Sequence, residues 1–454
     1  MNQTAGRAAP ESTLHMLPDL YRIAGRTAHA LLPAFLPAVN ALAPNWEVRQ
    51  RLGNYQRTAA AQTVGPLLWI HAASVGEMQA ARALIAALTE KISGGRFVLT
   101  AMTRQGRDAA RAWLPQTVRC ELAPIDTPQA VTAALRTLRP DLYVCLETEL
   151  WPTMLLEAGR AGIPMLLLNG RLSESSFRRY QRIGDFMADL LKGFTAVGVI
   201  REEDGDRYCQ LGVDAGRIKV CGNLKYDLPA ADAAVVRKKY QRLLTPGGKK
   251  IFICGSTRSG EEELLLSVYR RLRTETADKL LWIIAPRHLN RLDEVRQLLA
   301  QARLEHELLS DCVTKGRSKD IVLVDSLGEL ADLYALGDFN FCGGSLAAKG
   351  GHNIMEPVRW HRPVLFGPFM HDYQDAADLV LTAGAGFQVR DAKELADRLS
   401  VLLRDERHWQ QVCLAAERLA CSQQGAAQRQ ADLVLRELEA RPVTSSFSPA
   451  QKAI

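Results

Sequence analysis

The first residues that could carry chemistry follow an apolar run near the start of the chain. The run LLWIHAA leads into Ser74-Val75-Gly76-Glu77, a pattern typical of a strand that turns into a helix. A carboxylate in the first turn of a helix can cap it, because the helix dipole favours negative charge there. It can also serve as a general base in a cleft. The sequence leaves both roles open for Glu77.

Two more polar loops follow later apolar runs in the same half of the chain. Glu147 and Glu149 come at the end of LYVCL, and Asn169 lies at the end of PMLLLNG. Ligands of open parallel sheets bind beyond the carboxyl ends of the strands, so these loops predict a cleft, although the two glutamates could instead cap the following helix. Lys225, in GNLKYD, suits an anionic sugar or phosphate. No basic strip interleaved with aromatic residues accompanies it, so we expect no nucleic-acid partner.

The second half of the chain has loops that carry positive charge. Arg258 follows the run IFICGST, and Arg287 follows LLWIIAP, where a guanidinium can hold a phosphate through two hydrogen bonds. Four histidines stand in separate loops without the H-x-x-x-H spacing of a metal site, so we expect no metal: His71, His288, His352 and His371.

Two glycine pairs, Gly343-Gly344 and Gly350-Gly351, precede Asn353 and Glu356 in the segment GGSLAAKGGHNIMEP. Glycine permits close backbone approach, and a helix predicted to begin near Asn353 would offer unpaired N–H groups to an anion. Glu356 could accept hydrogen bonds from ribose hydroxyls. The segment therefore predicts an anion cradle, with a tightly packed β-to-α turn as the structural alternative.

These loops need strands to position them, and a regular series of apolar runs predicts those strands. The runs lie at 67–73, 96–102, 142–147, 164–170 and 196–200, and then at 251–256, 280–286, 321–325, 339–344 and 364–368. Helix-like segments separate them, which predicts two α/β domains with parallel sheets of the Rossmann type. The motifs G-x-G-x-x-G and G-x-x-x-x-G-K-[ST] are absent from the sequence, which argues against a dinucleotide oxidoreductase and a P-loop NTPase.

The length of 454 residues also favours two domains. We predict an N-terminal tail and membrane-associating segment at 1–60, a first domain at 61–230, a linker at 231–250, a second domain at 251–440 and a flexible tail at 441–454.

The N-terminal part contains an uncharged stretch from Thr27 to Trp46 that includes three prolines and is flanked by arginines. Three prolines make a membrane-spanning helix marginal, whereas an apolar segment with a basic rim is typical of one that lies on a membrane surface. A surface hairpin packed on the first domain is the alternative. The net charge of +7 suits an anionic partner without choosing among substrate, membrane and nucleic acid.

Eight motifs, taken together and in order, resemble those of the 3-deoxy-D-manno-octulosonic acid (Kdo) transferases of lipopolysaccharide inner-core synthesis. They are HAASVGE, LETELWP, NGRLSESSFRRY, GNLKYD, GSTRSGEEE, APRHLNR, DSLGEL and FCGGSLAAKGGHNIMEP. The resemblance extends over about residues 20 to 425.

The resemblance implies a GT-B glycosyltransferase with two Rossmann-like domains facing across a cleft, an inverting mechanism, and no metal or cofactor. It implies CMP-Kdo as donor, the tetra-acylated lipid A precursor as acceptor, and association with the cytoplasmic side of the inner membrane through the N-terminal segment. By motif, Glu77 matches the general base, and Glu147 and Lys225 match positions that stabilise the transition state. The CMP-binding segments match Pro286, Arg287, Leu327, Gly328, Glu329, Asn353, Ile354, Met355 and Glu356.

Two rival functions stay open at this point. A nucleotide-sugar epimerase of the same fold would also use carboxylates and a phosphate site, but it acts on soluble sugars and needs no apolar N-terminal segment. A nucleotide-sensing or nucleic-acid-binding module is favoured only by the net charge of +7. Fractionation with membranes would favour the transferase, and a freely soluble protein would favour the epimerase.

Overall fold

The computed structural model describes residues 16–42, 46–56, 65–227, 232–245, 247–277 and 279–440. These residues form two compact units. The first unit holds the described residues up to Asp227 together with those from Gly425 onward, and the second holds the described residues between them. The expected tail at 441–454 and the first 15 residues of the expected N-terminal tail lie outside the described residues.

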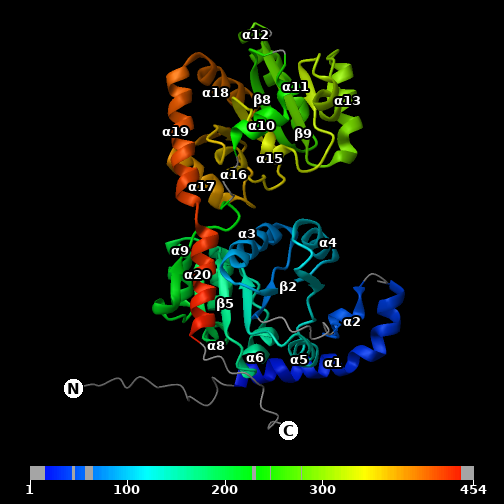
Figure 1. Ribbon diagram of the computed structural model, residues 1–454, viewed down its shortest axis with the longest axis vertical. Coiled ribbons are helices and arrows are strands. Elements are labelled where there is room, and N and C mark those ends of the chain that lie inside the picture. The colour runs from blue at the N-terminus through cyan, green and yellow to red at the C-terminus, as the bar shows by residue number, and fades with distance from the viewer. Residues whose placement is uncertain are drawn as a thin grey trace, which may run out of the picture. The chain divides into compact units, whose positions relative to one another are not determined.

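The first unit is built on a seven-stranded sheet with the order β3-β2-β1-β4-β5-β6-β7, and every pair of neighbouring strands is parallel. The strands are β1 (Leu67–His71), β2 (Arg96–Ala101), β3 (Arg119–Leu122), β4 (Leu142–Leu146), β5 (Met165–Gly170), β6 (Phe194–Val199) and β7 (Ile218–Val220). The helices are α1 (Met16–Leu42), α2 (Val48–Arg51), α3 (Val75–Lys91), α4 (Arg104–Trp113), α5 (Pro128–Leu138), α6 (Pro152–Arg160), α7 (Glu174–Gln181), α8 (Gly184–Leu191), α9 (Glu202–Gln210) and α20 (Ala426–Glu439) (Figure 1).

The second unit repeats this plan with a parallel sheet in the order β10-β11-β9-β8-β12-β13-β14. The strands are β8 (Lys250–Thr257), β9 (Leu280–Pro286), β10 (Glu307–Leu308), β11 (Ile321–Leu323), β12 (Phe339–Cys342), β13 (Val364–Phe366) and β14 (Gly386–Gln388). The helices are α10 (Ala233–Lys239), α11 (Gln241–Leu244), α12 (Glu261–Glu275), α13 (Leu292–Gln301), α14 (Leu309–Lys315), α15 (Leu330–Leu333), α16 (Met355–Val358), α17 (Gln374–Ala383), α18 (Ala392–Arg404) and α19 (Glu406–Gln423).

The apolar runs form strands because both faces of each sheet are covered. In β1, Leu68 and Ile70 belong to one core cluster, and Leu67 and Trp69 belong to the cluster on the other face. A strand buried on both faces needs apolar side chains at every position, which produces an unbroken run. All ten predicted strands are present, and the prediction of two parallel α/β domains is confirmed.

Helix α20 departs from the expected domain boundary, since we assigned residues up to 440 to the second domain. Ala431, Leu433 and Val434 of α20 are buried in the core of the first unit, where α20 packs against α3. Asp227 accepts hydrogen bonds from the backbone N–H groups of Gly425 (3.0 Å) and Ala427 (2.6 Å) and so caps the helix. The apolar face of α20 thus completes the first unit, although the helix follows the second unit in sequence.

The expected linker at 231–250 also differs. Its described residues form α10 and α11, and Val236, Tyr240 and Leu243 are buried in a core cluster of the second unit together with Ile251 and Val322. These residues belong to the second unit because their apolar side chains cover one face of its sheet.

The described residues 27–42 of the N-terminal stretch belong to a long helix and not to the hairpin considered as an alternative. Helix α1 continues through Pro33 and Pro37 and lies against α5, α6 and α8 (Figure 1). Arg22 donates to Glu157 (2.7 Å), and the Tyr21 hydroxyl donates to Asp126 (3.1 Å). Within the described part of the chain, no helix combines the length and apolar character needed to cross a membrane.

Candidate active site

In each sheet the chain reverses its direction of winding between two neighbouring strands, β1 and β4 in the first unit and β8 and β12 in the second. Loops beyond the carboxyl ends of such a pair splay apart and leave room for a ligand. Glu77 follows β1, Glu147 follows β4, Arg258 follows β8, and Asn353 and Glu356 lie on the connection after β12. The structure thus places residues from each predicted site at these two ligand-binding edges.

Glu77 is the third residue of α3, and its carboxylate turns back toward the start of the helix. Oε2 accepts a hydrogen bond from the backbone N–H of Ala73 (2.7 Å), and Oε1 accepts one from the Ser74 hydroxyl (2.7 Å). This is a capping arrangement. The same contacts fix the direction of the carboxylate, so capping and positioning are achieved together.

The electrostatic surroundings of Glu77 go beyond what a cap needs. Burial raises the pKa of Glu77 to about 7, with repulsion from Glu147 and Glu149 adding to the effect and the hydrogen bonds from Ser74 and Ala73 opposing it. Burial also raises the pKa of Glu149. A carboxylate with a pKa near neutral pH can both accept and release a proton at that pH, which is what a general base requires.

Lys225 lies beside this carboxylate group, as the sequence predicted. Its ammonium forms an ion pair with Glu147 (2.5 Å). Glu147 has a left-handed backbone, with φ of 58°, which is uncommon for a residue with a side chain and is often found at functional sites. The structure therefore brings Glu77, Glu147 and Lys225 into one electrostatic cluster.

The loop that carries Lys225 is held by a buried amide network that we did not predict. Asn169 accepts from the backbone N–H of Leu224 (2.8 Å), and Asn223 accepts from the backbone N–H of Lys225 (2.9 Å). Gln430, on α20, accepts from the backbone N–H of Asn169 (2.7 Å). The helix that joins the first unit from the end of the chain therefore supports the loop of Lys225.

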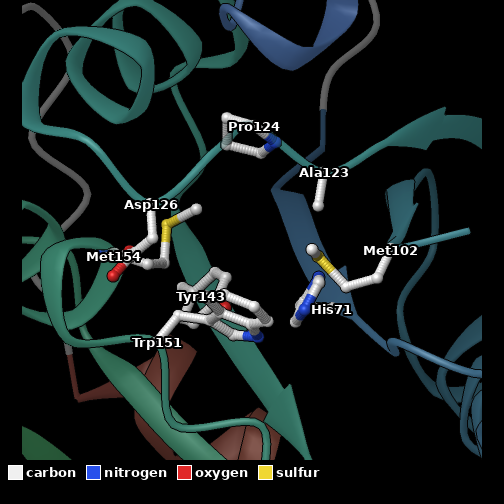
Figure 2. Close-up of a pocket in the computed structure, with 8 residues that line it drawn as sticks. All are labelled: His71, Met102, Ala123, Pro124, Asp126, Tyr143, Trp151 and Met154. Carbon is white, nitrogen blue, oxygen red and sulfur yellow. Dashed lines mark hydrogen bonds between the residues drawn. The ribbon is translucent and has the colours of Figure 1, made fainter. Parts of the chain in front are cut away.

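Trp151, two residues after Glu149, lines a small cavity. Figure 2 shows the rings of His71, Tyr143 and Trp151 along it, together with Asp126. Its volume is about 10 Å³, which is the space of one water molecule and too small for a sugar ring or an acyl chain. Trp151 donates to Glu149 (3.0 Å), so the cavity wall fixes one of the carboxylates near Glu77.

In the second unit the proposed CMP-binding residues come from three loops. Pro286 ends β9, and Arg287 follows it with an exposed side chain. Leu327 is 77% exposed, and Gly328 has φ of 90°. Glu329 accepts from Lys239 (2.8 Å), the last residue of α10, and from the hydroxyl of Tyr240, which follows it.

The first glycine pair does not form an open anion cradle, contrary to the prediction. The carboxylate of Glu261 fills it and accepts hydrogen bonds from the backbone N–H groups of Gly344 (2.7 Å), Ser345 (3.0 Å) and Leu346 (2.9 Å). A Cβ on Gly343 would lie 2.6 Å from the Ser256 oxygen. The glycines do allow close approach, but the groups that approach them are the Glu261 carboxylate and the Ser256 backbone and not a ligand.

The helix expected near Asn353 is also different. Helix α16 has only four residues, Met355–Val358, and the Asn353 side chain accepts from the backbone N–H of Met355 (3.1 Å). The first amides of this segment are therefore partnered within it. Burial raises the pKa of Glu356 to about 7, against the attraction of Arg359 and Arg287, and none of the described residues forms a hydrogen bond with its carboxyl group. That group is free to accept from a ligand hydroxyl.

The side-chain contacts of Arg258 were not predicted. Its guanidinium donates to His352 Nε2 (3.3 Å) and to His288 Nε2 (2.5 Å). The sequence showed Arg258 after a strand and the histidines in later loops, but it gave no sign that the three meet. Across the described ranges, no group of three or more His, Cys, Asp or Glu side chains is arranged to hold a metal ion.

Comparison with known proteins assigns the chain to a family. Residues 46–228 match the family model described as 3-Deoxy-D-manno-octulosonic-acid transferase (kdotransferase). The 3-deoxy-D-manno-octulosonic acid transferase of Bordetella pertussis is 32% identical over 397 residues, which are 85% of this chain and 91% of that protein. The chain belongs to the 3-deoxy-D-manno-octulosonic acid transferase family.

Other relatives agree with this assignment. The Haemophilus influenzae transferase of the same name is 29% identical over 415 residues, 90% of this chain and 96% of its own length. A bifunctional glycosyltransferase/methyltransferase of Fusobacterium nucleatum is 30% identical over 74% of this chain, but the chain spans only 52% of that longer protein. As a Kdo transferase family member the protein is a glycosyltransferase.

Solved structures confirm the fold class. The UDP-GlcNAc 2-epimerase of Neisseria meningitidis matches with a TM-score of 0.56 at 13% identity, over 82% of this chain and 99% of that chain. A glycosyltransferase of Rickettsia africae matches with a TM-score of 0.54 at 15% identity, over 83% and 99%. Similarity at this level shows the shared GT-B type of fold alone, so it gives the epimerase alternative no support beyond the fold.

Proposed function

We propose that the protein transfers Kdo from CMP-Kdo to a hydroxyl of the lipid A precursor, with Glu77 as the general base. The observation that carries the proposal is the pKa of about 7 of Glu77, a buried carboxyl group beside Glu147 and Glu149. Membership of the Kdo transferase family indicates the donor sugar. In the first unit, Glu77 is the base that deprotonates the acceptor.

The chemistry needs one proton transfer and one displacement. Glu77 removes the proton of the acceptor hydroxyl as that oxygen forms a bond to the anomeric carbon of Kdo. The bond from this carbon to the phosphate oxygen breaks, and CMP leaves with the electron pair. Attack opposite the leaving group inverts the configuration at the anomeric carbon.

Lys225 and Glu147 stabilise charge beside the base. The ammonium of Lys225, 2.5 Å from Glu147, stabilises the negative charge that develops on the acceptor oxygen as its proton moves to Glu77. The carboxylate of Glu147 stabilises the positive charge that develops at the anomeric carbon as CMP leaves. Fixed charges that are already oriented stabilise a transition state without reorganising during the reaction.

The second unit binds the leaving group. Arg287 is exposed, and within the described residues it forms no ion pair, so its guanidinium is available to a phosphate. Glu356 is available to ribose hydroxyls, with Asn353, Ile354 and Met355 shaping the turn that carries it. Pro286, Leu327, Gly328 and Glu329 complete the CMP-binding set that the family motifs indicate.

Helix α1 supports association with the membrane that holds the lipid acceptor. Leu20, Ile23 and Leu31 are 50%, 59% and 56% exposed, and their spacing puts them on one face of the helix. Arg26 is exposed near them. An apolar helical face with a basic neighbour is typical of a helix that lies at the surface of an anionic membrane, and the cytoplasmic side of the inner membrane is the surface expected for the family.

The direct test is product analysis. Purified protein is incubated with the tetra-acylated lipid A precursor and CMP-Kdo generated in situ, and the lipid product is weighed by mass spectrometry. A gain of one or more Kdo units supports the proposal. No gain, with CMP still bound by the protein, would contradict the proposed acceptor and leave only the nucleotide site.

A further inference from the structure

Arg258 has an unusual set of side-chain partners. Nε donates to His352 (3.3 Å) and Nη1 donates to His288 (2.5 Å). Since a guanidinium has no acceptor and stays protonated, both imidazoles must accept through Nε2 and are neutral. Within the described residues, Nη2 of Arg258 has no hydrogen-bond or ion-pair partner. Nη2 of the guanidinium therefore keeps both of its N–H groups for a ligand.

The backbone around Arg258 is built to hold this arrangement. The backbone N–H of Arg258 donates to the buried carboxylate of Glu261 (2.9 Å), which also accepts from the backbone N–H of Gly344 in the first glycine pair. Gly344 has φ of 69°, and a Cβ there would lie 3.1 Å from the ring of His352. The glycine loop therefore packs directly on the imidazole that orients Arg258.

Among the described residues, the negative charge of Glu261 offsets only part of the positive charge around Arg258. Burial lowers the pKa of Arg258, and repulsion from Arg287 lowers it further. Burial, Arg287 and Arg258 lower the pKa of His352 to about 3. Glu261 is occupied by backbone amides, and Glu262 is occupied by Arg291 (2.9 Å).

Two cations that repel each other at the end of neighbouring strands favour a ligand with two negative groups. Arg258 follows β8, Arg287 follows β9, and β8 pairs directly with β9. In a nucleotide-activated ulosonic acid, the carboxylate and the phosphate oxygen are attached to the same anomeric carbon. The two anions of such a donor are thus close together. The two arginines are close along the backbone as well, because the backbone N–H of Arg287 donates to the carbonyl of Thr257, the residue before Arg258 (3.0 Å).

We propose that Arg258 binds the carboxylate of the donor sugar acid, beside the phosphate bound by Arg287, with His288 and His352 as positioning residues. This inference rests on the proposed function and deepens it. The unused N–H groups of Nη2 can form charge-assisted hydrogen bonds to a carboxylate. Because neutral sugars lack this group, Arg258 selects sugar-acid donors.

The test separates affinity for the donor from affinity for CMP, which lacks the carboxylate. For Arg258→Ala we expect the KM for CMP-Kdo to rise about 10- to 100-fold, while the Kd for CMP from calorimetry stays within about twofold of the wild-type value. Arg258→Lys keeps the charge but loses the planar guanidinium, so its KM for CMP-Kdo should lie between those of the wild-type protein and Arg258→Ala. Arg296→Ala, on the exposed side of α13, is the matched control and should change neither value.

His352 tests the positioning role. Gln places an acceptor oxygen near the place of Nε2, whereas Leu places none. His352→Leu should raise the KM for CMP-Kdo with little change in kcat, and His352→Gln should restore much of the loss. A simple packing role predicts the opposite order, because Leu fills the space at least as well.

The outcomes distinguish this inference from the proposed function. If Arg258→Ala weakens CMP as much as CMP-Kdo, Arg258 binds the phosphate and the inference is wrong. It is also wrong if the wild-type protein uses CMP-Kdo and the variant has an unchanged KM. If the wild-type protein binds CMP but does not use CMP-Kdo, the proposed function fails first and the inference fails with it.

Discussion

The two units share one sheet topology, but their ligand-binding edges carry opposite charge. The edge of the first unit gathers Glu77, Glu147 and Glu149, and Lys225 pairs with Glu147. The edge of the second gathers Arg258 and Arg287 with two neutral histidines. Since strand order and winding agree, the chemistry of each edge comes from its loops and not from the fold.

Like charges have opposite consequences at the two edges. In the first unit, burial and repulsion between carboxylates raise the pKa of Glu77 to about 7, which makes a base. In the second unit, burial and neighbouring arginines lower the pKa of His352 to about 3, which keeps an imidazole neutral as a hydrogen-bond acceptor. One edge is suited to take a proton, and the other is suited to hold an anion.

The largest effect should come from removing the base. We expect Glu77→Gln to lower kcat for transfer by about 10²- to 10⁴-fold, because the acceptor hydroxyl then keeps its proton. The rate is measured with saturating donor and acceptor. Glu202→Gln, another carboxylate in the first turn of a helix of the same unit, is the control. Loss of rate in both variants would show a general effect of charge and not a base.

The corresponding change in the second unit should act on affinity. Arg287→Ala should raise the KM for CMP-Kdo about 10- to 100-fold, because a charge-assisted hydrogen bond to phosphate is lost. Initial rates over a range of donor concentrations give this value. An unchanged KM would show that Arg287 does not bind the phosphate. It would contradict the anion-binding role assigned to the edge of the second unit.

A third pair of changes tests whether lipid binding belongs to α1 and is separate from nucleotide binding by the second unit. Leu20→Asn and Ile23→Asn should each weaken binding to anionic lipid vesicles by about tenfold, since an apolar contact with the membrane is lost. Sedimentation with vesicles measures this binding. Leu414→Asn is the matched control, because Leu414 lies in the second unit and is 53% exposed. Equal losses in all three variants would contradict a membrane role specific to α1.

The smallest effect should be a shift in the pH profile. The ionised form of Glu77 is active, so kcat/KM should rise with pH through the pKa of about 7 and be lost as pH falls below it. Glu149→Gln removes one repelling charge and lowers this pKa, so the acidic limb should move to lower pH by less than about one unit. A pH profile of each enzyme measures the shift.

Glu90→Gln is the control for this profile, because it removes a carboxylate from the exposed far end of the same helix, α3. Its acidic limb should stay where the wild-type limb lies. A shift of the Glu149→Gln limb to higher pH would contradict the repulsion between the two carboxylates.

The sequence predicted the central strands well and missed the outer ones, for a physical reason. Strands such as β1 and β4 are buried at every position, so an apolar run marks them. The missed strands β3, β7, β10 and β14 are the two outer strands of each sheet. They are two to four residues long and partly exposed, so their side chains are mixed and show no run.

The positions of Glu77 and Glu147 were predictable because each follows a predicted strand, whereas Lys225 was found by its motif, since the strand before it, β7, was missed. The site was not predictable where two distant segments had to meet. Nothing local distinguishes Glu261 and Glu262 from Glu263 in the sequence, yet the first two are buried and the third is exposed. Glu261 is held by amides of the distant loop 343–347, and Glu262 by Arg291. The docking of α20 on the first unit likewise depends on the fit of two apolar surfaces far apart in the chain.

We propose a division of roles in which the first unit carries the base and the second binds the donor nucleotide. Calorimetric titration of CMP into Glu77→Gln and Arg287→Ala, without acceptor, tests this division directly. We expect the Kd of Glu77→Gln for CMP to equal that of the wild-type protein. We expect the Kd of Arg287→Ala to be about 10- to 100-fold higher. Weakened binding in Glu77→Gln together with wild-type binding in Arg287→Ala would contradict this division of roles.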